Sequence, residues 1–238
     1  MDGKHRIISD PPLIVPIEEV AGVSSDKVEP MLRKLVTTYR RTLDADRRML
    51  AARYHYAHAA HKVVGVGSVG SRAWIVLLLG RDADDPLFLQ AKEAQRSVLE
   101  PYASKCPFDN QGRRVVEGQR VMQAAGDVFL GWLRLEGLDG EQRDYYVRQL
   151  WDGKASAEVD PMGPTELTRY GRACGWTLAR AHARSGDREA IAAYLGSGTA
   201  FDEAIADFAQ AYADQNERDY ESLLEEVRAG RLEVREGI

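Results

Sequence analysis

Short apolar runs bounded by turn residues fill the middle of the chain and predict β-strands. The clearest run, residues 73–79, is β-branched, aromatic and continuously apolar, and it stops at Gly80. A polar turn follows at 81–86, and another turn surrounds Gly140. The predicted strands are residues 62–64, 73–79, 87–92, 128–135 and 144–150.

Apolar residues at helical spacing predict helices on both sides of this strand region. Residues 26–58 predict one long helix, and residues 111–125 predict a helix between the third and fourth strands. From Pro164 onward the pattern is entirely helical. The predicted C-terminal helices are 164–182, a short helix capped by Asp187 and ended by Gly196, and two more over 204–212 and 220–227.

The first 23 residues contain several prolines and predict an extended arm. The arm is apolar for a free tail, so we expect it to pack on the rest of the protein. The patterns divide the chain into an arm and long helix (1–60), a sheet with its helix (61–152) and a helical part (153–238). Together they predict an α+β fold.

Composition narrows the classes of function. The chain has 238 residues, of which 44% are hydrophobic, so it can bury a core. Its net charge of −5 argues against general nucleic-acid binding. The longest apolar run is too short to span a bilayer, and the N-terminus has no signal-peptide segment, so we expect no membrane partner. Cys106 and Cys174 lack metal-type spacing and predict free thiols in a reducing cytoplasm.

Residues 65–70 form a G-x-G-x-x-G run between two predicted strands. A dinucleotide-binding loop needs a helix after this run, so that the pyrophosphate meets the helix N-terminus, whereas a strand follows here. A glycine loop between antiparallel strands is typical of protein kinases, where it covers the nucleotide phosphates. Taken alone, the glycines also fit a tight hairpin. The candidate phosphate-binding residues are Gly65, Gly67, Ser68 and Gly70.

Lys92 ends the third predicted strand, where kinases place a lysine that contacts the nucleotide phosphates. Such a lysine needs a carboxylate to orient it. Glu117 in the following helix is the best candidate, with Glu93 and Glu100 as alternatives, although Glu93 should point to the opposite face of the strand. The segment from Gln149 would be the hinge that meets the adenine. ATP is therefore the expected ligand.

Three histidines, His55, His58 and His61, are spaced three apart. On a helix, neighbouring pairs would share a face and could bind a metal. No Cys, Asp or Glu lies close by to complete a zinc site, so we favour ordinary histidines at the end of a helix.

The segment from His182 through Arg184 to Asp187 has a faint similarity to a kinase catalytic loop. The asparagine and the metal-binding aspartate that should follow are missing. We therefore favour a helix cap for Asp187, while His182 and Arg184 could still face a site from the end of their helix. No catalytic or metal-binding residue is assigned.

Five segments of the chain carry recognisable motifs: residues 62–72, 88–94, 114–120, 145–150 and 174–184. Together these motifs resemble the bacterial DUF2252 family. The resemblance extends over nearly the whole chain and implies a fold similar to protein kinases and aminoglycoside phosphotransferases. That fold would have an antiparallel N-lobe-type sheet with flanking helices and an all-helical C-terminal part.

The chain departs from the family pattern in one respect. Longer members carry a Gly-Asp-x-His-x-x-Asn-Phe-Gly segment and an Asn-Asp-Phe-Asp-like segment before the glycine run, in an order that looks circularly permuted. This sequence contains neither. It therefore resembles the C-terminal half of such a protein: a nucleotide-binding portion, with magnesium held only if a missing N-terminal half or a partner supplies the absent segment. The alternative is a non-catalytic interaction protein of kinase-like fold, with the glycine run as a plain hairpin.

Overall fold

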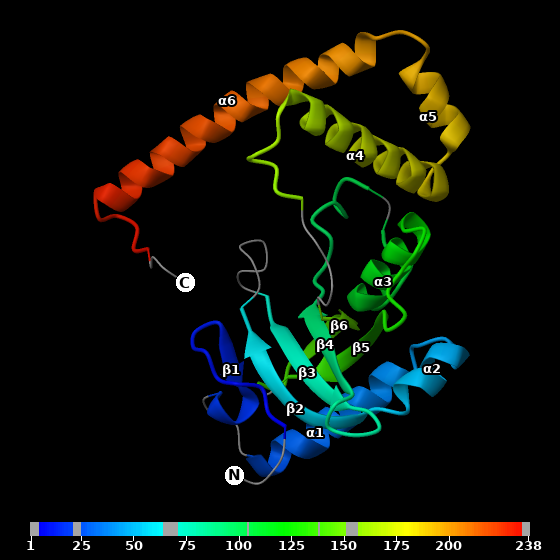
Figure 1. Ribbon diagram of the computed structural model, residues 1–238, viewed down its shortest axis with the longest axis vertical. Helices are drawn as coiled ribbons and strands as arrows, with labels where there is room; N and C mark the ends of the chain where they lie inside the picture. The colour runs from blue at the N-terminus through cyan, green and yellow to red at the C-terminus, as the bar shows by residue number, and fades with distance from the viewer. Residues whose placement is uncertain are drawn as a thin grey trace. The chain divides into compact units, whose positions relative to one another are not determined.

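The computed structural model describes residues 5–20, 25–63, 71–103, 105–137, 139–150 and 157–234 (Figure 1). These residues form an α+β fold with one antiparallel sheet of six strands, six α-helices and a short 3-10 helix, which confirms the predicted class. In chain order the elements are β1 (Ile14–Pro16), η1 (Ile17–Glu19), α1 (Ser25–Arg40), α2 (Ala45–Ala51), β2 (His55–Lys62), β3 (Ala73–Leu79), β4 (Pro86–Glu93), α3 (Gln111–Met122), β5 (Gly131–Glu136), β6 (Gln142–Gln149), α4 (Pro164–Ser185), α5 (Arg188–Leu195) and α6 (Ala200–Arg228).

The strands are ordered β1-β2-β3-β4-β6-β5, so β4 lies between β3 and β6. Ala91 pairs with Trp74 on one side and with Val147 on the other. The strand predicted at 62–64 overlaps β2 only at Lys62, so its bounds are wrong. The other four predicted strands are confirmed with small shifts at their ends. The largest shift is in β5, which begins at Gly131 because Asp127 forms a turn before it: the Asp127 Oδ1 atom accepts the Phe129 N–H at 2.8 Å.

The hydrophobic core lies between α1 and one face of the sheet. Because side chains alternate along each strand, every second residue of β3, β4 and β6 points toward this helix. Tyr39 of α1 is buried, and its hydroxyl donates a hydrogen bond to the carbonyl of Phe129. The core residues of α1 and of the three strands are Leu32, Leu35, Val36, Tyr39, Val76, Leu78, Leu87, Leu89, Ala91, Tyr145 and Val147.

The helix α3 contacts β5 and β6 and is fixed at its N-terminus. The Asn110 side chain caps it by accepting the Arg113 N–H at 2.9 Å. Asp144 of β6 accepts hydrogen bonds from the Asn110 side chain at 2.8 Å and from the Gln111 N–H at 2.7 Å. A Cβ atom on Gly112 would lie 2.1 Å from the Tyr145 carbonyl oxygen. Glycine is therefore required where the first turn of α3 meets β6.

The prediction of one long helix over 26–58 is wrong. The first helix ends at Arg40, a short helix α2 follows, and a strand begins at His55. Thr42 makes the break: its hydroxyl donates to the Tyr39 carbonyl at 2.7 Å and accepts the Trp132 N–H at 3.1 Å. The three histidines therefore lie on β2 and not on a helix, so the face they were expected to share does not exist.

The N-terminal arm packs on the sheet, as predicted. Its strand β1 pairs with β2, and Ile17 is buried in the core. His58 accepts the Ile7 N–H at its Nδ1 atom, so its proton sits on Nε2, which lies 3.0 Å from the Glu18 carboxylate. This buried imidazole ties two points of the arm to β2.

The C-terminal helices differ from the prediction in one place. The Asp187 side chain caps α5 by accepting the Glu189 and Ala190 N–H groups at 3.0 Å, as predicted. The two helices expected over 204–227 are one continuous helix, α6. The polar segment between them favours helix, and Gln215 donates to Asp219 at 2.7 Å across one turn.

The chain divides into two compact units, Met1–Ala181 and His182–Ile238, with the boundary inside α4. The sheet, α1 and α3 belong to the first unit. The helices α5 and α6 belong to the second, and α6 exposes several large apolar side chains, including Ile205, Phe208 and Tyr212. None of the described helices combines the length and apolar content needed to cross a membrane.

Replacing Gly112 tests the close approach of α3 to β6. We expect Gly112→Ala to lower the free energy of unfolding, because its methyl group would collide with the Tyr145 backbone. The control is Gly118→Ala in the same helix, where an added Cβ atom would meet nothing within 4 Å. This variant should raise the free energy of unfolding by up to about 1 kcal/mol. Urea unfolding measures both, and equal effects of the two variants would contradict this account.

Acid sensitivity tests the link between the arm and β2. Burial favours the neutral Glu18 carboxyl, but hydrogen bonds from His58 and the main chain, with the charges of His58 and Arg6, hold its pKa below the usual 4.5. A lowered pKa means that the stabilisation is complete above 4.5 and is lost as the pH falls. Below about pH 5, as the pH falls through the lowered pKa of Glu18, the wild type should therefore lose more stability than Glu18→Gln. Glu19→Gln, which keeps an oxygen to accept the Ser9 hydroxyl, should behave as the wild type does.

Candidate functional site

Strand β4 carries two kinds of side chain on its two faces. Leu89 and Ala91 are buried in the core beneath α1. Gln90 and Lys92 therefore point to the opposite face of the sheet. Gln90 is only 4% exposed, which is unusual for a polar side chain, and Lys92 is half-buried. A glutamine and a lysine two residues apart thus form the beginning of a polar site.

Strand β6 completes this site from the neighbouring position in the sheet. Lys92 is paired with Tyr146, and Gln90 with Arg148. Paired residues on adjacent strands point to the same face, so all four side chains lie together. We call Gln90, Lys92, Tyr146 and Arg148 the cationic patch.

The cationic patch holds two positive charges, those of Lys92 and Arg148. Arg148 is oriented by Gln90, whose Oε1 atom lies 3.4 Å from both Nε and Nη2 of the guanidinium. Burial lowers the pKa of the Lys92 ammonium, and the nearby Arg148 charge lowers it further. Within the described residues, neither Lys92 nor Arg148 forms an ion pair with a carboxylate.

This arrangement is suited to binding an anion. Two half-buried cations that repel each other would both gain from a negative group placed between them. A guanidinium and an ammonium are also the side chains that bind phosphate most strongly. Burial raises the pKa of the Tyr146 hydroxyl, so it stays protonated and can donate a further hydrogen bond.

The proposed carboxylate partner of Lys92 is engaged elsewhere in this structure. The Glu117 Oε1 atom lies 3.8 Å from Arg113 Nε and 3.5 Å from Arg120 Nη1, and no ion pair joins it to Lys92. Of the two alternatives, Glu100 pairs with Arg96 at 3.1 Å.

Glu93 points to the other face of the sheet, as predicted, because it alternates with Lys92. There it lies 3.4 Å from Arg72 and 3.9 Å from Arg143. The structure thus leaves Lys92 without any of the three carboxylates that the sequence offered.

Gln149, the expected start of the hinge, lies at the end of β6 next to the cationic patch. Its N–H donates to the Asp127 Oδ2 atom at 2.5 Å, and the Leu150 N–H donates to the Phe88 carbonyl at 2.8 Å. Both main-chain donors are therefore occupied within the protein. A ligand would have to use other groups of this segment.

The glycine-run candidates Gly65, Gly67, Ser68 and Gly70 lie outside the described residues. The strands that flank them are described: His61 of β2 pairs with Trp74 of β3. The run thus connects two adjacent antiparallel strands, and a strand instead of a helix follows it. This excludes the dinucleotide-binding arrangement, which needs a helix there.

Arg148 and Gln90 were not chosen as site residues from the sequence. The signal that could have found them is the period of two in each strand. Gln90 lies two residues before Lys92, and both interrupt an otherwise apolar run. What the sequence could not supply is the register that places Arg148 opposite Gln90.

The other candidate motifs have structural roles or stay untested. His58 holds the N-terminal arm, and in the described parts of the chain no three His, Cys, Asp or Glu side chains are grouped closely enough to bind a metal ion. His182 and Arg184 lie in the last turn of α4, before the Asp187 cap. Cys106 and Cys174 are free thiols, as predicted.

Comparison with known proteins places the chain in a family. The family model described as "Uncharacterized protein conserved in bacteria (DUF2252)" matches residues 1–226. No curated protein and no solved structure gives a significant match. Because the match extends over nearly all of the 238 residues, this protein belongs to the DUF2252 family of bacterial proteins.

Proposed function

We propose that this chain is the nucleotide-binding portion of a kinase-like phosphotransferase and that the phosphates of ATP bind at the cationic patch. The observation that carries the proposal is the pair Lys92 and Arg148, two half-buried cations on adjacent strands without a carboxylate partner in the described residues. An anionic ligand would supply the missing negative charge.

The order of the elements supports the same proposal. A strand, the glycine run, a second strand, a third strand with Lys92 and a helix with Glu117 follow one another as in kinase-like nucleotide sites. Glu117 would have to leave Arg113 and Arg120 to reach Lys92. Those ion pairs are partly exposed, so exchanging them costs little.

Magnesium does not fit the cationic patch alone. The ion prefers oxygen ligands, chiefly carboxylates, and none of the four side chains is a carboxylate. Asp144, two residues before Tyr146, is occupied by Arg134 at 2.6 Å and by the N-terminus of α3. We therefore assign no magnesium ligand here.

Catalysis needs further groups. The sequence contains no Gly-Asp-x-His-x-x-Asn segment. Phosphoryl transfer depends on metal ions and on a residue that orients the nucleophile. We propose that the chain binds the nucleotide without transferring its phosphate, and that a separate segment, in the circularly permuted order, or a partner protein supplies the catalytic loop and magnesium ligands.

Nucleotide titration of charge variants tests the proposal. We expect Lys92→Met and Arg148→Met each to weaken ATP binding roughly tenfold or more, since each removes a charge-assisted contact. Calorimetry with ATP, AMP and adenosine should show that the affinity rises with the number of phosphates. The wild-type affinity should also fall with added salt.

The matched control for these variants is Arg53→Met. Arg53 is exposed and lies just before β2, whose first residue pairs with the end of β3. Lys92 instead pairs with the first residue of β3, so the two cations lie near opposite ends of that strand. The loss of Arg53 should leave ATP affinity unchanged. If Lys92→Met and Arg148→Met bind ATP as the wild type does, or if the wild type does not bind it, the cationic patch is not a nucleotide site.

A second candidate is a non-catalytic interaction protein, which the apolar surface of α6 favours. Phe208 and Tyr212 stack with ring centroids 5.8 Å apart while both remain exposed. Exposed aromatic side chains on one helix are typical of protein interfaces. Under this alternative, ATP would leave the thermal stability of the chain unchanged.

A further inference from the structure

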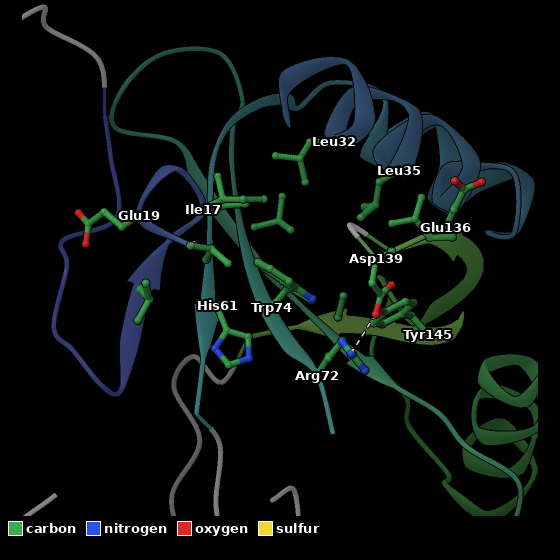
Figure 2. A pocket seen from close by; sticks show the side chains of 17 residues that line it. Ile17, Glu19, Leu32, Leu35, His61, Arg72, Trp74, Glu136, Asp139 and Tyr145 are labelled. Carbon is green, nitrogen blue, oxygen red and sulfur yellow. Dashed lines mark hydrogen bonds and ion pairs between the residues drawn. The ribbon is translucent and has the colours of Figure 1, made fainter. Parts of the chain in front are cut away.

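The face of the sheet opposite the cationic patch contains a cavity of about 540 Å³ (Figure 2). It lies between α1, η1 and the strands, entirely within the first compact unit. Its volume is within the range of small-molecule sites, which is roughly 300–1,000 Å³. Most of its wall is apolar: Ile17, Leu32, Leu35, Trp74, Ala91 and Tyr145.

Among the described residues, the charged groups at this cavity leave no uncompensated cation for an anionic ligand. Arg72 lies 3.4 Å from Glu93 and 3.3 Å from Asp139, so its charge is compensated, and Figure 2 shows Asp139 directed toward it. Glu19 and Glu136 lie at opposite edges, and neither forms an ion pair with a described residue. A carboxylate or phosphate would therefore meet an excess of negative charge.

The apolar wall also disfavours a cationic ligand. An ammonium group loses much of its hydration when it enters such a cavity, and it needs a carboxylate inside to compensate. Glu19 and Glu136 are exposed at the edges, and the third carboxylate of the lining, Asp139, is already held by Arg72 at 3.3 Å and by Arg143 at 2.6 Å. An uncharged ligand avoids both costs.

His61 gives the cavity one polar contact point. Its ring meets Trp74 edge-on, with centroids 5.3 Å apart. Burial lowers the pKa of its imidazole, and the Arg72 charge lowers it further, so the ring is neutral at physiological pH. Neither ring nitrogen forms a hydrogen bond with the described part of the chain. A neutral imidazole offers one N–H donor and one acceptor.

We propose that this cavity binds an uncharged, largely apolar small molecule whose single hydroxyl or carbonyl group hydrogen-bonds to His61. The walls of Leu32, Leu35 and Ala91 would bury its apolar body. The site is separate from the cationic patch, because Ala91 and Lys92 are successive residues of β4 and face opposite sides of the sheet.

Three probes with the same number of carbon atoms test the charge of the ligand. Decan-1-ol, decanoate and decylamine each have an unbranched ten-carbon skeleton and differ in the head group, and each is titrated calorimetrically into the full chain below its solubility limit or micelle concentration. We expect decan-1-ol to bind most tightly and to raise the melting temperature. Tighter binding of decanoate or decylamine would overturn the proposed class of ligand, and no binding of any probe would overturn the site.

Two histidine variants test whether the ligand contacts His61. His61→Phe keeps the ring shape and removes the hydrogen bond, so it should weaken decan-1-ol binding roughly two- to tenfold. The control on the same strand is His55→Phe, which is exposed and outside the cavity and should change nothing. Equal affinity of His61→Phe and the wild type would overturn the role of His61.

Filling the cavity completes the test. Ala91→Leu should abolish binding by occupying the space. Because a larger residue in a packed strand can prevent folding, Val15→Trp at the half-buried strand β1 provides a second way to close the same cavity. Decan-1-ol that still binds a folded form of either variant would show that it binds elsewhere.

Discussion

The register of β4 between β3 and β6 is the constraint on which the rest of this structure depends. Backbone hydrogen bonds hold the strand on both sides, so its side chains can point to each face in only one way. A slip by one residue would turn Lys92 into the core beneath α1 and would expose Leu89 and Ala91. Burying an unpaired ammonium in an apolar core and exposing Leu89 and Ala91 both cost free energy, so the two costs add against the slipped register. The hydrophobic core therefore selects the register that also assembles the cationic patch.

The same register separates the two kinds of site. Glu93 ends β4 on the core face, where it and Asp139 compensate Arg72 beside the cavity. On the opposite face, neither Lys92 nor Arg148 forms an ion pair with a carboxylate of the described residues. The net charge of −5 thus gives no indication of the local potential at either face, because it does not show which cations have carboxylate partners. One sheet can present an apolar cavity on one side and a site for anions on the other.

Several elements could be predicted because their signals are local. The apolar run of β3, the position of Lys92 at the end of a strand and the Asp187 cap each depend on a few neighbouring residues. The strand β2 could not be predicted, because its histidines and alanines carry little strand preference and its conformation comes from pairing with β1 and β3. The apolar spacing of α1 also continues past its end, since Leu43 is buried although it lies in the turn. Glu117 was a reasonable partner for Lys92 by helix position alone, but Arg113 and Arg120 on its own helix reach it first.

The sequence by itself determined the α+β class, the approximate positions of the central strands and the family membership. These depend on the period of apolar residues and on the motifs, which are properties of short segments. Only the tertiary structure decided which polar side chains share a face. Arg148 and Gln90 are 58 positions apart, and they meet because antiparallel pairing of β4 with β6 sets them opposite each other. The cavity beneath α1 was likewise invisible in the sequence, because its walls come from a helix, an arm and several strands that only the packed core brings together.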